Sequence, residues 1–278
     1  MYRLFFALLV CASVGCSGAD SQPKKETVSL KSVSSEQWDR LASRTFYFGH
    51  QSVGQDLIDG VKKVLAANPQ IKLAVNDGFL GEGPGFQHYY VGKNEDPVSK
   101  NVSFVSTMKQ NRAPNPVMMF KYCYIDVNRN TNIDELFQLY VRSIEEVRQA
   151  QPGATIVHIT MPVRVSEPEW RYRVNRMRGI FTQRELNAKR NRFNELLFAK
   201  YQGKDPIFDL AEIESTRADG SREVAKVDGK PVYSLAPEWS YDGKHLNEQG
   251  SVRAAEHFLV FLAGLPRPKE PVVTASTR

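Results

Sequence analysis

Apolar and polar positions follow two different periods along this chain. Apolar residues spaced three and four apart predict amphipathic helices over 55–68, 132–151, 182–201 and 247–265. Short continuous apolar runs predict strands over 44–49, 71–75, 116–127, 154–163 and the start of 206–213. Strands and helices that alternate in this order predict an α/β domain with a mostly parallel sheet of about five strands.

A long glycine-rich segment, residues 76–100, shows neither period and is predicted to be a loop. Sites in parallel sheets form beyond the carboxyl ends of the strands. The segments of interest therefore follow the predicted strands or precede the last helix. Besides the glycine-rich segment, they are GHQSVG (49–54), YIDVNRN (124–130) and YDGKHLNEQG (241–250).

The N-terminal segment predicts export. Residues 1–15 hold one early positive charge, Arg3, and then an unbroken apolar stretch, which is typical of a secretory signal. A glycine directly before Cys16 resembles the bacterial lipoprotein signal, in which that cysteine is lipidated; ordinary cleavage a few residues later is the alternative. The expected location is the bacterial cell envelope, lipid-anchored through Cys16, or the periplasm.

The remaining chain divides into three predicted parts. Residues 16–38 are polar and predict a tether, residues 39–265 predict one folded domain, and residues 266–278 predict a disordered tail. Outside the signal and Cys16, only Cys123 remains, so no internal disulfide is possible. Because Cys123 stands in an apolar run, we expect a buried, inert thiol.

Composition and charge narrow the function classes. Hydrophobic residues make up 41% and charged residues 24%, as in a soluble globular protein with a full core. The net charge is +6, and the Lys and Arg residues gather in 171–192 without interleaved aromatic residues, so nucleic-acid binding is not predicted. A solvated helix face and a surface for an anionic polymer or lipid head group are the two interpretations of this cluster.

Ser52 is the candidate nucleophile at the end of the first predicted strand. A serine hydroxyl is a weak nucleophile at neutral pH and needs a base within hydrogen-bond reach. His245 is the candidate base, and Asp242, three positions earlier, can hold the far nitrogen of its ring. Each residue alone also has an ordinary structural interpretation: a helix cap for Ser52, a turn for Asp242 and a surface histidine for His245.

A serine after the first strand, with Asp-x-x-His-Leu-Asn before the last helix, resembles the SGNH, or GDSL-like, hydrolases. The resemblance spans roughly residues 44–264 and is sharpest at its two ends. It implies a flavodoxin-like three-layer α/β/α sandwich, with Ser52 as nucleophile, His245 as base and Asp242 as its partner. FGHQSVG replaces the usual Gly-Asp-Ser block, which indicates a divergent branch.

The resemblance also raises the question of the oxyanion hole. The family uses the serine amide, a glycine after the second strand and the asparagine of a Gly-x-Asn after the third strand. Here no Gly-x-Asn follows the third predicted strand, whereas Gly92 and Asn94 form one earlier in the chain. Either that loop or rebuilt backbone amides supply the donors. The candidate oxyanion or substrate-binding residues are Gly54, Gly92, Asn94, His50 and Asp126.

The predicted function is an exported serine esterase that needs no cofactor and hydrolyses acyl esters, notably acetyl esters, on carbohydrate. Acyl transfer to a sugar hydroxyl is a close variant, and a non-catalytic glycan- or partner-binding lipoprotein is the alternative. A metal site is a rival interpretation, but its candidate ligands lack metal-binding spacing, so no metal is predicted; they are His50, His88, His245, Asp126 and Asp242. His158 is expected in the core, and His257 is expected to be structural.

Overall fold

The computed structural model describes residues 28–78 and 83–267. The predicted signal, the lipidation at Cys16 and the tail from residue 268 lie outside these residues. No helix among the described residues is long and apolar enough to cross a membrane.

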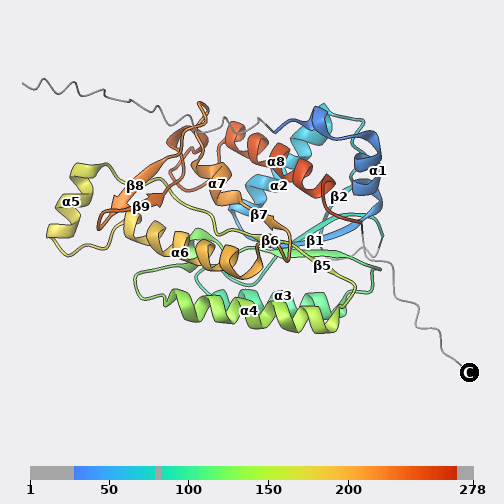
Figure 1. Ribbon diagram of the computed structural model, residues 1–278, viewed down its shortest axis with the longest axis horizontal. Helices are drawn as coiled ribbons and strands as arrows, with labels where there is room; N and C mark the ends of the chain where they lie inside the picture. The colour runs from blue at the N-terminus through green and yellow to red at the C-terminus, as the bar shows by residue number, and fades with distance from the viewer. Residues whose placement is uncertain (1–27, 79–82, 268–278) are drawn as a thin grey trace, which may run out of the picture.

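A parallel sheet forms the centre of the molecule (Figure 1). Its strand order is β2-β3-β1-β4-β5, and every neighbouring pair is parallel. The bounds are β1 Thr45–His50, β2 Val75–Asp77, β3 Gly85–Tyr90, β4 Val117–Phe120 and β5 Thr155–Ile156. A second parallel pair, β6 (His158–Ile159) and β7 (Ile207–Phe208), continues this edge, because the amide of Val157 donates to the carbonyl of Met118 at 3.0 Å.

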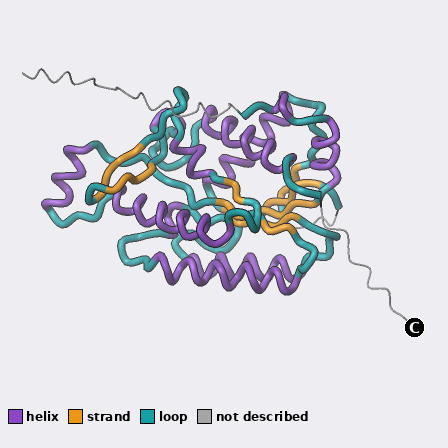
Figure 2. Tube along the Cα trace, viewed as in Figure 1, coloured by secondary structure: helices purple, strands orange, loops and turns teal. Residues whose placement is uncertain are grey.

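Helices cover both faces of the sheet, so the chain forms three layers (Figures 1 and 2). One face carries α1 (Ser35–Ser43), α2 (Val53–Ala67), α7 (Leu210–Ser215) and α8 (Glu248–Ala263). The other carries α3 (Pro97–Gln110), α4 (Ile133–Ala150) and α6 (Gln183–Tyr201). Side chains alternate along β1, with Phe46 and Phe48 in the first core and Tyr47 in the second. The predicted α/β fold with a parallel sheet is confirmed.

Helices α2 and α8 approach each other closely on the first face. At the crossing, a Cβ atom on Gly60 would lie 2.2 Å from the carbonyl oxygen of Ser251 and 3.1 Å from Cβ of Ala255. Glycine is therefore the one residue type that allows this approach. Ser52 precedes α2 and the 241–247 segment precedes α8, so this crossing joins the two segments that carry the candidate chemistry.

The prediction of a loop over 76–100 is wrong. This segment contains β3, which lies between β2 and β1 in the sheet, and the start of α3. The apolar pattern of β3 is interrupted because the polar residues Gln87 and His88 are buried there. The helical pattern of α3 is interrupted in the same way, because Lys100 and Asn101 are buried. The strand predicted at 71–75 begins only at Val75, at the last residue of that range.

Further elements lie outside the sequence prediction. Helix α5 (Glu169–Met177) and the hairpin β8 (Val224–Val227) and β9 (Lys230–Tyr233) lie together at one end of the molecule in Figure 1. Three short 3-10 helices are η1 (Leu30–Ser32), η2 (Tyr124–Asp126) and η3 (Pro237–Trp239). The predicted boundary at residue 38 falls inside α1, where Trp38 and Leu41 are buried against the core.

Candidate active site

Ser52 stands at the turn between β1 and α2. Its carbonyl accepts hydrogen bonds from the amides of Gln55 (2.7 Å) and Asp56 (3.1 Å), so it occupies the N-cap position of α2. Its side chain, however, makes no capping hydrogen bond. The hydroxyl Oγ lies instead 3.8 Å from Sγ of Cys123. The hydroxyl group is therefore not used to stabilise the helix, although the backbone position is that of a cap.

Asp242 holds His245 in a defined orientation. Asp242 Oδ2 lies 2.8 Å from Nδ1 of His245, and Asp242 Oδ1 accepts hydrogen bonds from the amides of His245 (2.8 Å) and Lys244 (2.9 Å). Partial burial acts to raise the pKa of Asp242, but the hydrogen bonds from His245 and the two amides prevail and lower it to about 2. The carboxylate is thus ionised at neutral pH, which keeps the proton on Nδ1 and leaves Nε2 as an acceptor.

The loop around His245 is built to hold this pair. Gly243 has a φ of +79°, which favours glycine, and its amide donates to Ser240 Oγ at 2.9 Å. Ser240 Oγ in turn donates to the carbonyl of His245 at 2.7 Å. The ring of Tyr241 stacks on that of His245, with centroids 5.9 Å apart.

Three contacts bring His245 and Ser52 to the same corner of the sheet. Nε2 of His245 lies 3.3 Å from the hydroxyl of Tyr124, the residue directly after Cys123. Cys123 faces Ser52, as described above. Asp56, one turn into α2, accepts a hydrogen bond from the amide of Leu246 at 3.1 Å. In this arrangement Nε2 is hydrogen-bonded to Tyr124 rather than to Ser52.

Cys123 contacts Ser52 and is itself in contact with Lys121. The predicted burial of Cys123 is confirmed, since its exposure is 0%. Nζ of Lys121 lies 3.9 Å from Sγ of Cys123, and Lys121 is 1% exposed. Lys121 was not among the predicted site residues, although a lysine directly after the apolar residues of β4 was a signal in the sequence. The structure thus places a buried lysine against Cys123, the residue that contacts the candidate nucleophile.

His50 is buried below the turn rather than exposed to substrate. Its Nε2 lies 3.0 Å from Nδ1 of His88, and Nε2 of His88 lies 2.6 Å from Oδ1 of Asp77. Burial, with added repulsion from Lys121 and His88, lowers the pKa of His50 to about 3, so the ring is neutral. A Cβ atom at position 54 would lie 2.3 Å from Cβ of His50, so Gly54 makes room for this ring.

The amide of Gly54 is also used within the turn, because it donates to the carbonyl of Gln51 at 2.7 Å. Gly54 is itself buried. Neither His50 nor Gly54 reaches solvent, so both support the segment that carries Ser52.

Gly92, Asn94 and Asp126 belong to a buried network beside the site. Nε2 of Gln51 donates to the carbonyl of Gly92 at 2.9 Å, which links the serine turn to the loop after β3. Nζ of Lys100 donates to Asp126 Oδ2 at 2.6 Å and to Asn94 Oδ1 at 3.0 Å. Asp126 and Lys100 have fully buried side chains.

Asp126 also accepts a hydrogen bond from the amide of Cys123 at 2.7 Å and one from the amide of Glu95 at 3.0 Å. Its two oxygens therefore fasten the loop after β3 to η2. Lys100, whose charge neutralises Asp126, was not among the predicted site residues. These contacts give Asn94 and Asp126 a structural role and locate Gly92 next to the serine turn.

The five residues considered as metal ligands do not form one cluster. His50 and His88 pair with each other and with Asp77, whereas His245 pairs with Asp242. Within 28–78 and 83–267, no group of three or more His, Cys, Asp or Glu side chains could hold a metal ion. The expected core location of His158 is confirmed: it is fully buried, with Nδ1 at 2.7 Å from the hydroxyl of Tyr140.

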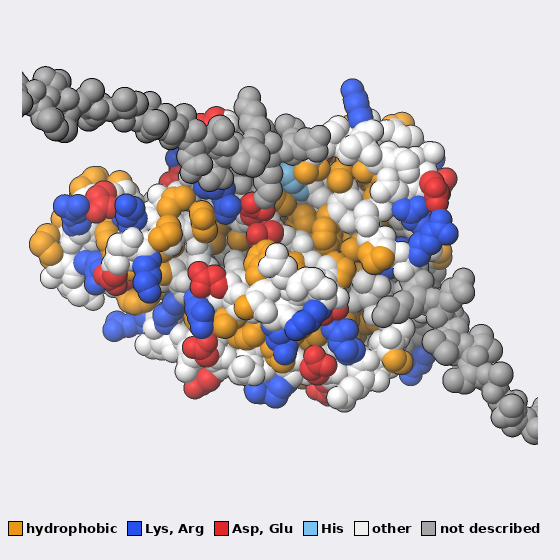
Figure 3. Space-filling view, in the orientation of Figure 1, with side chains coloured by type: hydrophobic (Ala, Val, Ile, Leu, Met, Phe, Trp, Pro, Cys, Tyr) orange, Lys and Arg blue, Asp and Glu red, His pale blue; other side chains and the backbone are white. Residues whose placement is uncertain are grey.

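The basic cluster at 171–192 is partly structural. Arg190 is 1% exposed, and its Nε donates to the carbonyl of Tyr124 at 3.0 Å. Burial and the charge of Arg164 lower the pKa of Arg190 to about 9. Arg184 is buried as well. Figure 3 shows Lys and Arg side chains mixed with hydrophobic ones at the α5 end. Trp170 and Met177 of α5 are exposed. One arginine of the cluster thus positions Tyr124, which contacts the candidate base.

No family model matches this sequence, and no curated protein matches it. Its structural neighbours are SGNH/GDSL-like hydrolases at low sequence identity. A GDSL-like lipase from Bacteroides thetaiotaomicron is 12% identical, with 82% of this chain and 91% of that chain covered and a TM-score of 0.45. An acetyl xylan esterase is 12% identical (77% and 97% covered, TM-score 0.43). A peptidoglycan O-acetylesterase is 13% identical (64% and 45% covered, TM-score 0.41). These values assign no activity to the chain.

Proposed function

We propose that this chain is a serine esterase of the SGNH type. Ser52 is the nucleophile, His245 the general base and Asp242 the residue that orients the base. The observation that carries the proposal is the Asp242–His245 pair. Nε2 of His245 contacts Tyr124, the residue after Cys123, and the hydroxyl of Ser52 lies against Cys123 without a capping hydrogen bond. A serine whose hydroxyl is not used for capping, followed along the chain by an aspartate and a histidine that pair, provides the parts of an acyl-transfer site.

The first chemical step follows from the hydrogen bonds. Oγ of Ser52 attacks the ester carbonyl carbon, and its proton passes to Nε2 of His245, which exchanges its hydrogen bond with Tyr124 for one with Ser52. Asp242 stabilises the imidazolium that forms. Collapse of the tetrahedral intermediate breaks the bond to the alcohol oxygen, and His245 returns the proton to that oxygen. A water molecule, deprotonated by His245, then attacks the carbonyl carbon of the acyl-serine. The bond to Oγ of Ser52 breaks, His245 returns the proton to Oγ, and the carboxylic acid is released.

The start of α2 supplies the oxyanion donors in this proposal. The amides of Gly54, Gln55 and Asp56 donate within the turn. The amides of Ser52 and Val53 come before them, and the first amides of a helix have no intrahelical acceptor. Together with the positive end of the helix dipole, they favour negative charge beside Oγ of Ser52. The missing Gly-x-Asn is replaced by these backbone groups.

The proposed substrate is an acyl ester of a carbohydrate, notably an acetyl ester, met outside the cytoplasm by a chain anchored through Cys16. Two exposed aromatic rings beside the site support a sugar ligand. Tyr241 is 68% exposed and stacks on His245, and Tyr90 is 64% exposed with its hydroxyl 3.2 Å from Oε1 of Gln55. Flat rings with a polar edge suit the faces and hydroxyl groups of sugars.

A non-catalytic binding module is the second candidate. The observation that favours it is the hydrogen bond between Nε2 of His245 and Tyr124, which leaves Ser52 facing the sulfur of Cys123. In that case the same aromatic rings would bind a glycan without turnover.

The test is intact mass after exposure to a fluorophosphonate probe. We expect one adduct on the wild type and on Ser106→Ala, which changes an exposed serine of α3, and no adduct on Ser52→Ala. A wild type that takes up no probe and does not hydrolyse p-nitrophenyl acetate would contradict the esterase and favour the binding module.

A further inference from the structure

A pocket of about 260 Å³ lies at the opposite end of the sheet from Ser52. It is lined by the end of α1, the start of β1, the residues before β3 and β4, and the end of α8. Strand β1 separates it from the candidate active site. At about 3.3 Å per residue, the step from Thr45 to His50 is roughly 17 Å.

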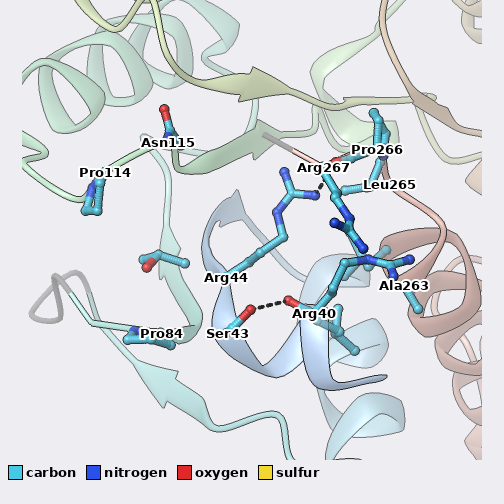
Figure 4. A pocket seen from close by; sticks show the side chains of 13 residues that line it. Arg40, Ser43, Arg44, Pro84, Pro114, Asn115, Ala263, Leu265, Pro266 and Arg267 are labelled. Atoms are coloured by element: carbon cyan, nitrogen blue, oxygen red, sulfur yellow. Dashed lines mark hydrogen bonds between the residues drawn. The ribbon is translucent and has the colours of Figure 1, made fainter. Parts of the chain in front are cut away.

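Three arginine side chains lie on one side of this pocket (Figure 4). Arg40 comes from α1, Arg44 from the residue before β1, and Arg267 from the segment after α8. The prolines Pro84 and Pro114 lie on the opposite side. Two segments far apart in the sequence, one with Arg40 and Arg44 and one with Arg267, thus place three positive charges around this pocket.

The positive charges exceed their protein partners. Glu36 pairs with Arg40 at 3.1 Å and with Arg267 at 2.7 Å. Among the described residues, no other carboxylate lies within 4 Å of these two guanidinium groups, and none lies within 4 Å of Arg44. Three guanidinium groups and one carboxylate leave an excess of two positive charges.

Arg44 is the buried member of the group, with an exposure of 8%. One of its terminal nitrogens donates to the carbonyl of Pro266 at 2.9 Å and the other to Oγ1 of Thr155 at 3.2 Å. Its Nε–H is buried and donates to no described residue, and the same holds for Nε–H of Arg40. Burial, and then the charge of Arg40, lower the pKa of Arg44, so a nearby negative charge would favour its charged form.

We propose that this pocket binds a phosphate monoester. Two excess positive charges match a dianion better than a carboxylate, and guanidinium groups recognise phosphate oxygens by paired N–H donors. A volume of about 260 Å³ lies below that of sites for drug-sized ligands, so the phosphate belongs to a small molecule or to a lipid head group. Because the pocket lies at the other end of the sheet, this inference is independent of the esterase function.

The test is calorimetric titration of the purified protein at low ionic strength with glycerol 3-phosphate, with acetate as the monoanion control. A second arm uses vesicles of phosphatidylcholine with and without phosphatidic acid. Saturable binding of glycerol 3-phosphate indicates a soluble ligand, and binding to phosphatidic acid vesicles alone indicates a lipid head group. Absence of binding in both arms, or equally strong acetate binding, overturns the proposal.

Variants separate a built site from general electrostatic attraction. Arg40→Gln and Arg267→Gln are expected to weaken binding about tenfold or more, since each removes a charged hydrogen-bond donor. Glu36→Gln is expected to tighten binding, because it frees both partners from a competing carboxylate. Arg171→Gln on α5 removes the same charge far from the pocket and should change nothing. If it weakens binding as much as Arg267→Gln does, the proposal fails.

Ser52→Ala keeps the pocket intact and should bind glycerol 3-phosphate like the wild type, whatever its effect on hydrolysis. A circular dichroism spectrum of each variant shows whether it remains folded.

Discussion

At the residue scale, the candidate site depends on which groups are already hydrogen-bonded. The hydroxyl of Ser52 is not used for capping, whereas the amide of Gly54 and both oxygens of Asp126 are used within the protein. A residue type in the right segment therefore does not by itself identify a catalytic group. The surrounding contacts decide whether that group remains available to a substrate.

Asp242→Asn tests the orientation of the base. The side-chain amide introduced at position 242 can donate a hydrogen bond to Nδ1 of His245. This favours the tautomer that carries its proton on Nε2, and a protonated Nε2 cannot accept the proton of Ser52. We expect esterase activity to fall by a factor of about 10² to 10⁴ while thermal stability changes little. The measurement is kcat/KM with p-nitrophenyl acetate. Asp219→Asn, at an exposed turn, is the control, and full activity of Asp242→Asn would contradict the assigned role.

Gly54→Ala tests the packing of His50 under the serine turn. The added Cβ would lie 2.3 Å from Cβ of His50, so the turn or the ring has to move. We expect a loss of about 1–3 kcal/mol in the free energy of unfolding, measured with urea. Gly83→Ala is the matched control, because its Cβ meets nothing within 4 Å. Equal stability of the two variants would show that the turn is not tightly packed.

His50 also predicts a pH dependence of stability. Its pKa in the folded protein is about 3, below the ordinary value of 6.5, so the unfolded chain binds a proton that the folded chain does not. Stability should therefore decrease as the pH falls from about 6.5 towards 3, by about 3 kcal/mol at pH 4 from this one group. Urea unfolding at several pH values measures it. His50→Gln should show a shallower decrease, and an unchanged slope would refute this origin.

At the element scale, sequence periodicity identified helices α2, α4, α6 and α8 and strands β1 and β4, but it missed β3 and α3, which carry buried polar side chains. Helix α4 and helix α6 agree with their predicted ranges to within a residue. Strand β3 was missed because His88 and Gln87 are buried there, and His88 is paired with His50 on the neighbouring strand. Such partners come from distant parts of the chain, so no local pattern reveals them.

The buried pair of Lys100 and Asp126 fastens α3 to η2 and should be sensitive to the loss of one partner. Lys100→Met leaves a carboxylate buried without its counter-charge, and we expect a loss of about 3–5 kcal/mol in the free energy of unfolding. Lys109, also on α3, forms an exposed ion pair with Glu146 of α4, and Lys109→Met should cost under about 1 kcal/mol. Similar losses in the two variants would contradict a special role for the buried pair.

At the scale of the whole molecule, the order of strands and helices sufficed to predict a parallel sheet covered on both faces, because this topology follows from alternation alone. The corner that holds the candidate site was predicted from the carboxyl ends of the strands. The contribution of Tyr124, Lys121 and Arg190 was not, since each acts through contacts formed only when distant segments pack.

Local stability should differ between the sheet and the α5 end. Strands β1 and β4 are buried throughout, whereas Tyr172 is the one buried residue of α5. Hydrogen exchange followed by mass spectrometry should therefore show the slowest exchange in peptides of β1 and β4 and faster exchange in α5 and the β8–β9 hairpin. Protection of α5 equal to that of β1 would contradict this order.

The close crossing at Gly60 has a consequence for protein engineering. The segments that carry Ser52 and His245 lie at the beginnings of the two helices that cross there, so the spacing between these side chains is set by a contact outside the site. A larger residue at position 60 would push α2 and α8 apart. The distance between Ser52 and His245 would change with them, without any substitution in either loop. For the proposed esterase, position 60 is therefore a place where the width of the candidate site could be changed without substituting Ser52, Asp242 or His245.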